Sequence, residues 1–160
     1  MALNAYLKLK GETQGIIKGS VTQKGLEDLI MVVAVNHEIN VPHVVGSIIS
    51  TGKRQHNPLV ITKTVDRSSP ALYHAMARNE SFSEFILQFY APTSRGTDAN
   101  HYTIKLTNAT ILHFKLNMSN NLEVGGKDFP VIETISFGYE QIEWIWTSEN
   151  LTAQDTVLST

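Results

Sequence analysis

The stretch Gly52-Lys-Arg-Gln-His-Asn-Pro-Leu-Val-Ile-Thr-Lys-Thr-Val-Asp-Arg-Ser-Ser-Pro70 contains the signals that decide the fold. Its first residue is a glycine, and Pro58 gives a second turn signal before an apolar segment. Leu59, Ile61 and Val65 then lie on one face of an extended chain, which is the spacing of a short β-strand. The stretch therefore predicts a turn followed by a strand, and it contains no arrangement suited to catalysis.

The end of the same stretch predicts a helix that begins at Ser69. Serine can accept a hydrogen bond from a free backbone N–H there, and Pro70 fits the first helical turn, where its missing N–H costs nothing. Asp66 lies close to the positive end of the expected helix. Asn79 is expected to end the helix after about three turns. An apolar stripe at helical spacing lies between these ends and consists of Leu72, Ala75 and Met76.

The rest of the chain is predicted to be β. Apolar residues alternate over 3–9 and 82–90, and the unbroken apolar run 29–35 predicts a strand covered on both faces. The alternation changes phase near Asn108, which predicts a bulge, and near Glu140-Gln141, where a long strand is expected to bend from one sheet onto another. Bent strands and one helix are typical of a small β-barrel or sandwich with the helix packed outside it.

At 160 residues the chain is expected to form one domain, residues 1–160, with one core. Residues 147–160 are polar and lack periodicity, so they are expected to form a loose tail. Charged residues are only 18%, which hints that other protein covers part of the surface. Basic residues outnumber acidic ones nine to six over 1–80, and acidic ones outnumber basic ones nine to four over 81–160, as head-to-tail stacking would favour.

Composition excludes several classes of function. The absence of cysteine excludes disulfides, thiolate metal sites and cysteine nucleophiles. Residues 1–8 lack the pattern of a signal peptide, and no apolar run is long enough to span a bilayer, so membrane insertion is not expected. A net charge of −2 with scattered basic residues argues against nucleic-acid binding.

The polar motifs do not add up to a catalytic, cofactor or metal site. Residues 46–54 resemble a phosphate-binding loop, but five residues separate the glycines, and Arg54 stands where the motif needs a hydroxyl. No two histidines have the spacing of a zinc-binding helix, and no Gly-x-Ser-x-Gly elbow occurs. Glu133 and Glu143 lie too far apart on a strand for shared acid–base work. We therefore expect no catalytic residues, no cofactor and no metal ligands.

Trp144 and Trp146 lie on one face of a predicted strand. Packing in the core and contact with another subunit both suit this pattern. The two interpretations stay open from the sequence.

Several long strings of the sequence resemble the Hcp (haemolysin-coregulated protein) family of type VI secretion tube proteins. The resemblance covers residues 5–155. The strings are Ala5-Tyr-Leu-Lys-Leu-Lys-Gly11, Gln14-Gly-x-Ile-Lys-Gly-Ser-Val-Thr-Gln-Lys-Gly25, Gly52-Lys-Arg-Gln-His-x-Pro58, Ile61-Thr-Lys63, Asp66-Arg-Ser-Ser-Pro70, Leu106-Thr-Asn-Ala109 and Ile142-Glu-Trp144. Leu26 and Thr156-Val157 depart from the family pattern.

The resemblance implies a mainly β fold, a two-sheet β-barrel with one flanking α-helix, and no enzymatic activity. It also implies six copies closing into a homohexameric ring, with stacked rings forming a hollow tube. Such a tube is assembled in the bacterial cytoplasm inside a contractile sheath, capped by a VgrG spike, and secreted without a signal peptide. Effector proteins can travel in its lumen.

The loop 40–58 is the segment in which the residues themselves also favour the stacking of rings. A long loop with an uncovered apolar patch promotes association, so we expect it to stack one ring on another. The residues expected to do so are Val41, Val44, Val45, Ile48, Ile49, Lys53 and Arg54. One alternative is a monomeric soluble β-barrel that acts as a binding or carrier module. Another is a hydrolase that uses His37 or His56 with a carboxylate.

Overall fold

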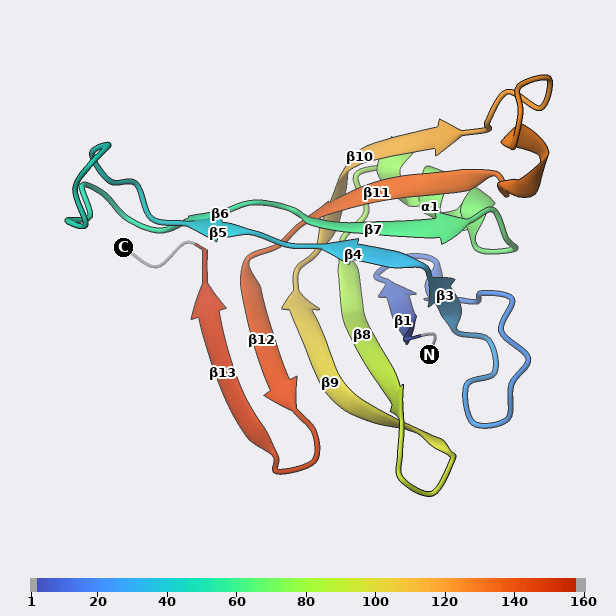
Figure 1. The fold of residues 1–160 in the computed structure, drawn as a ribbon, viewed down its shortest axis with the longest axis horizontal. Helices are drawn as coiled ribbons and strands as arrows, with labels where there is room; N and C mark the ends of the chain where they lie inside the picture. Colours follow the sequence, from blue (N-terminus) through green and yellow to red (C-terminus); the bar gives the residue numbers. More distant parts are fainter. Residues whose placement is uncertain (1–2, 158–160) are drawn as a thin grey trace.

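Two antiparallel β-sheets with one helix outside them form the body of the chain (Figure 1). The computed structural model describes residues 3–157. The larger sheet is seven-stranded, and β3 (Ile30–Val32) pairs with β1 in it. Its other strands are, in spatial order, β13 (Leu151–Thr156), β12 (Gln141–Trp146), β9 (Asp98–Thr107), β8 (Phe82–Pro92), β1 (Asn4–Gly11) and β2 (Gly15–Ile17).

The smaller sheet is four-stranded and lies over one end of the larger one (Figure 1). Its strands are, in spatial order, β10 (Thr110–Asn117), β11 (Ile132–Gly138), β7 (Leu59–Thr64) and β4 (Ala34–Asn36). A short pair, β5 (Ile39–Asn40) with β6 (Gln55–His56), projects from it. The remaining elements are the helix α1 (Ser69–Ala77) and the 3-10 turn η1 (Gly126–Asp128). The mainly β, two-sheet fold with one flanking helix is confirmed.

The core fills the space between the two sheets. Phe137 of the smaller sheet makes edge-to-face contacts with Phe85 and Phe82, with ring centroids 5.0 Å and 5.9 Å apart. Leu7, Leu87 and these three aromatic residues are almost completely buried. Aromatic pairs in this geometry stabilise a core beyond the area that they bury.

The chain passes from one sheet to the other at the phase changes seen in the sequence. β11 belongs to the smaller sheet and β12 to the larger one, which confirms the bend expected near Glu140-Gln141. At Asn108, whose φ is 52°, the chain crosses from β9 into β10. The alternation breaks at Asn108 because the chain changes sheets there, and the bulge expected near this residue lies a few positions later. The register shift on β10 lies further on, between Ile111 and His113.

The apolar run 29–35 also divides between the sheets. β3 pairs with β1 in the larger sheet, and β4 pairs with β7 in the smaller one. Met31 and Val33 are 43% and 53% exposed, so the expectation of one strand covered on both faces is wrong. Two half-buried strands in succession leave the same unbroken apolar string as one fully buried strand.

α1 packs against β10 and confirms the expected helix. Leu72 and Ala75 are buried, and the ring of Tyr73 stacks on Phe114 with centroids 3.9 Å apart. The helix ends before Asn79, which has a φ of 51°, as expected of a residue that closes a helix in the left-handed region.

The loose tail expected over 147–160 is wrong for its central part. Residues 151–156 form β13, which pairs with β12 in register from Gln141↔Thr156 to Trp146↔Leu151. An edge strand can be polar because one of its faces and its outer edge meet solvent. Residues 158–160, the end of the expected tail, lie outside the described residues.

Candidate assembly surface

A narrow hairpin of residues 41–54, which we call the arm, projects from the body at the left of Figure 1. Its base is the β5–β6 pair, and the N–H of Thr51 donates to the carbonyl of Pro42 over 2.8 Å. At the tip, Ser47 N–H donates to Val44 over 2.9 Å, and Gly46 has a φ of 83°. A side chain at Gly46 would be strained. The arm is therefore an ordered hairpin.

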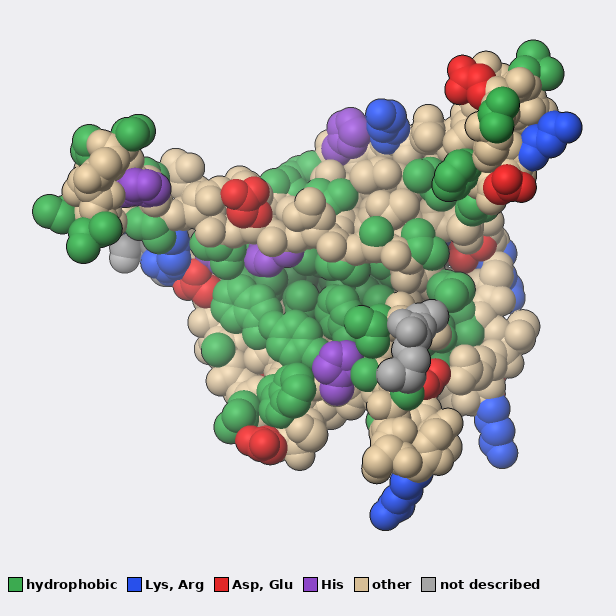
Figure 2. Space-filling view, viewed as in Figure 1, with side chains coloured by type: hydrophobic (Ala, Val, Ile, Leu, Met, Phe, Trp, Pro, Cys, Tyr) green, Lys and Arg blue, Asp and Glu red, His purple; other side chains and the backbone are tan. Residues whose placement is uncertain are grey.

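Apolar side chains cover the outer part of the arm, visible as the hydrophobic tip in Figure 2. Val45 is 97% exposed and Ile48 103% exposed. The exposed apolar residues here are Val41, Val44, Val45, Ile48 and Ile49, all predicted from the sequence. Burying one such side chain contributes about 1.5–3 kcal/mol, so the arm favours association with another surface.

The base of the arm is tied to β13 by a cluster of polar residues that the sequence analysis missed. Arg54 forms two hydrogen bonds of 2.5 Å with the carboxylate of Asp155. His56 Nε2 lies 2.7 Å from the same carboxylate. The hydroxyl of Tyr139 lies 2.9 Å from His56 Nδ1 and 2.7 Å from His37 Nε2. We call these five residues the anchor cluster.

The chemistry of the anchor cluster determines the direction of its hydrogen bonds. A carboxylate only accepts, so Nε2 of His56 carries a hydrogen and donates it to Asp155. In neutral His56, Nδ1 is then an acceptor for the hydroxyl of Tyr139. The oxygen of Tyr139 in turn accepts from His37. A continuous series of hydrogen bonds therefore links His37, just after β4, to Asp155 of β13. Tyr139 and His56 are the two residues between them.

Electrostatics fix the charge states of Asp155 and Tyr139 at neutral pH. The hydrogen bond from Arg54, helped by His56, holds the pKa of Asp155 well below its usual range. Burial, with the nearby charge of Asp155, raises the pKa of Tyr139 to about 12. Tyr139 is therefore not a phenolate nucleophile, and the side chain of His56 is only 3% exposed. The cluster suits positioning of the arm better than the hydrolase chemistry considered for His37 and His56.

We predict that Asp155→Ala loosens the base of the arm while the body stays folded. The change removes the carboxylate that accepts both hydrogen bonds from Arg54 and the one from His56. Amide hydrogen exchange in residues 39–56 should become at least about tenfold faster. Gln154→Ala is the control, because this exposed neighbour bonds only to Gln141 at its side chain. Unchanged exchange in the arm would contradict an anchoring role.

We also predict that His37 makes stability depend on pH. Burial, and secondarily the neighbouring His56, lower the pKa of His37 below 6.5. The unfolded chain therefore binds this proton more readily, so the stabilisation is complete above pH 6.5 and is lost as pH falls toward the folded pKa. His37→Gln keeps a donor for Tyr139 but cannot titrate. Urea unfolding should show a smaller loss of stability between about pH 7.5 and about pH 5.5 in the variant. Equal losses in the two proteins would contradict this role of His37.

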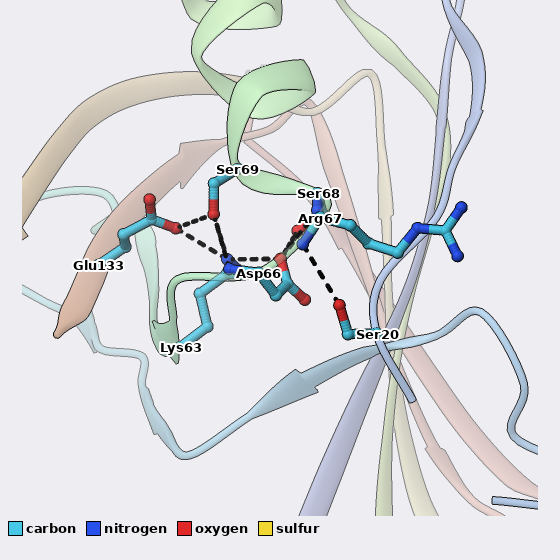
Figure 3. A network of polar contacts seen from close by, with 7 residues as sticks. All are labelled: Ser20, Lys63, Asp66, Arg67, Ser68, Ser69 and Glu133. Atoms are coloured by element: carbon cyan, nitrogen blue, oxygen red, sulfur yellow. Dashed lines mark hydrogen bonds and ion pairs between the residues drawn. The ribbon is translucent and has the colours of Figure 1, made fainter. Parts of the chain in front are cut away.

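Two of the three residues at the helix entry, Asp66 and Ser69, lie in a second polar network (Figure 3). Lys63 is completely buried, and its Nζ lies 2.8 Å from the carboxylate of Glu133 and 3.0 Å from that of Asp66. Ser69 Oγ donates to Glu133 over 2.9 Å and accepts from Lys63 over 3.1 Å. Ser69 also accepts from the backbone N–H of Asp66, before the helix, and Pro70 lies in the first turn. This network joins β7, β11 and α1.

The remaining expected loop residues differ from one another. Lys53 is exposed on the return limb of the arm, whereas Arg54 is held by Asp155. A signal for Arg54 and His56 existed in the sequence, since residues two apart on a strand point to one side. Their partner Asp155 was missed because it lay in a segment expected to be loose.

A second apolar protrusion, the connection 118–131 between β10 and β11, was not predicted. Leu122 is 92% exposed, Val124 107% and Phe129 66%. It lies at the opposite end of the long axis from the arm (Figure 1).

None of the helices in residues 3–157 has both the length and the apolar character needed to cross a bilayer. The described part of the chain contains no group of three or more histidine, cysteine, aspartate or glutamate residues placed to hold a metal ion.

Comparisons with known proteins agree on one family. The family model described as type VI secretion system effector, Hcp, matches residues 6–146. The major exported protein of Pseudomonas aeruginosa is 35% identical over 153 residues, which cover 90% of this chain and 89% of that protein. A crystal structure of an Hcp protein superposes with a TM-score of 0.90 at 26% identity, covering 99% of this chain and 100% of the other.

A further solved structure gives the same answer. The secreted protein Hcp3 from Pseudomonas aeruginosa superposes with a TM-score of 0.79 at 29% identity and covers 99% of this chain and 100% of its own. The matches therefore extend over nearly the whole length of both partners. The chain belongs to the Hcp family of type VI secretion proteins.

Proposed function

We propose that this chain is the structural subunit of a type VI secretion tube. Six copies close into a ring, and rings stack through the arm into a hollow tube. The tube assembles in the bacterial cytoplasm inside a contractile sheath, carries a VgrG spike at its end, and is secreted with effector proteins in its lumen. The subunit makes and breaks no covalent bonds.

The observation that carries this proposal is the arm. It is an ordered hairpin whose tip residues Val45 and Ile48 are as exposed as in an extended peptide. A hairpin held so firmly at its base does not fold back to cover its own apolar side chains. In stacked rings, contact with another copy would bury these side chains, and this burial would stabilise the stack.

The edges of the larger sheet support ring closure. β13 forms one edge, and β2 with β3 forms the other. Closing a ring requires two different surfaces of one subunit to meet, and two different edge strands meet that condition. Unpaired edge strands also offer backbone donors and acceptors to a neighbouring copy.

Sedimentation velocity and negative-stain electron microscopy of the purified chain test the proposal. We expect particles of six subunits that appear as rings, with stacks of rings at higher concentration. Sedimentation as a single chain at every concentration would refute it and favour the monomeric carrier instead.

A further inference from the structure

An apolar face of the seven-stranded sheet extends beyond the smaller sheet that covers the rest of it. Strand register orders the side chains of this face into rows. One row across β8, β9, β12 and β13 is Leu87, Ile104, Trp144 and Ala153, and the next is Phe89, Tyr102, Trp146 and Leu151. We define the aromatic face as Phe89, Tyr102, Trp144, Trp146, Leu151 and Ala153.

Burial falls steadily across these rows. Leu87 is 0% exposed, whereas Trp146 is 42% and Leu151 59% exposed. Figure 2 shows the result as a broad apolar surface in the middle of the molecule, where Figure 1 places β12 and β9. Beside it lies a hollow of about 240 Å³ whose lining includes Phe89 and Val35.

A continuous apolar area of this kind on a soluble protein marks a contact surface. Trp and Tyr are also the residues that contribute most strongly to protein interfaces. The described part of the chain leaves the outer row uncovered, so the face needs an occupant from another molecule.

The arm of the same molecule does not reach this face. The anchor cluster fixes the base of the arm against β13, and the arm extends past that edge strand, away from the aromatic face (Figure 1). An identical arm on a second copy has no such restriction.

The size and charge of the arm suit the face. Each limb of the arm has seven residues over 41–54, which span about 23 Å at about 3.3 Å per residue. The four strands from β8 to β13 span about 14 Å at about 4.8 Å per gap. The charge that the arm offers to another copy is Lys53, because Arg54 is bound to Asp155 of its own chain. The turn 147–150, between Trp146 and Leu151, carries one charged residue, the acid Glu149.

We propose that the aromatic face is the receptor for the arm of a second copy, whose tip valines and isoleucines pack on Trp144 and Trp146. This proposal rests on the proposed function, since it names the surface on which the stacking arm lands. It also assigns the tryptophans to a subunit contact, one of the two roles that the sequence left open.

Disulfide trapping tests the proposal directly because the natural chain has no cysteine. Purified Val45→Cys protein is mixed with Ala153→Cys protein that carries a tag, under oxidising conditions that permit assembly. The mixed disulfide should form at least tenfold faster than in a mixture of Val124→Cys with Ala153→Cys. Val124 is the matched control because it is an equally exposed valine, on the second protrusion.

Tryptophan fluorescence gives a second readout, since Trp144 and Trp146 are the only tryptophans of the chain. Their emission should shift to shorter wavelength as tubes form. Tubes on microscope grids with no Val45–Ala153 disulfide, or with an equal yield from Val124, would overturn this inference and leave the proposed function standing. Absence of rings and tubes altogether would overturn both.

Discussion

Replacing both Val44 and Ile48 by aspartate is expected to abolish the stacking of rings while leaving single rings intact. The two side chains lie 60% and 103% exposed on the arm, so their replacement leaves the core unchanged. Loss of their burial in the contact removes about 3 kcal/mol or more per arm, which raises the concentration needed for stacking at least about a hundredfold. The desolvation of a carboxylate adds to this effect.

Sedimentation velocity and electron microscopy of the double variant measure the outcome. Leu122→Asp with Val124→Asp is the matched control, because it places the same charges on an equally exposed apolar protrusion. We expect the control to form tubes. Tubes from the arm variant would show that stacking does not depend on the arm, and failure of both variants would show that it depends on the added charge alone.

The second large effect concerns stability. Lys63→Met leaves the carboxylate of Glu133, which is 1% exposed, without its cation. Removing one partner of a buried ion pair typically costs about 3–5 kcal/mol. Urea unfolding, followed by circular dichroism at one fixed subunit concentration, should therefore show a much lower midpoint than in the natural protein.

Two comparisons separate this effect from simple loss of a lysine. Lys8→Met breaks the exposed pair with Glu84, whose side chains are 47% and 31% exposed, and should cost at most about 1 kcal/mol. Lys63→Met combined with Glu133→Leu removes both buried charges, so it should recover most of the lost stability. If the Lys63→Met protein were as stable as the Lys8→Met protein, the network of Figure 3 would contribute little to the free energy of unfolding.

Features that depend on residues close together in the sequence could be predicted from the sequence alone. The strand after Pro58, the helix at Ser69 and the crossing at Glu140-Gln141 follow from side-chain period, the proline of the first helical turn and the change of phase, although Ser69 does not cap the helix with its side chain. The exposure of the arm followed from apolar residues within a long Gly/Pro-bounded loop. The long family strings also pointed to the fold, which the comparisons then confirmed.

Features that depend on partners distant in the sequence were not readable. Arg54 and Asp155 are separated by 101 positions, and β13 owes its form to backbone hydrogen bonds with β12. An edge strand that is half in solvent needs no apolar alternation, so its residues resembled a loose tail. The anchor cluster was hidden for the same reason, since three of its side chains meet only after β13 is in place.

The aromatic face shows most clearly what the local sequence pattern determines and what only the tertiary structure determines. Alternation along β12 placed Trp144 and Trp146 on one side of a strand, and this much is local stereochemistry. Whether that side is covered depends on how far the smaller sheet reaches over the larger one, a length set by where the chain crosses between them. The alternation along β12 thus assigned the two tryptophans to one face, and only the packing of the two sheets decided how much of that face stays exposed.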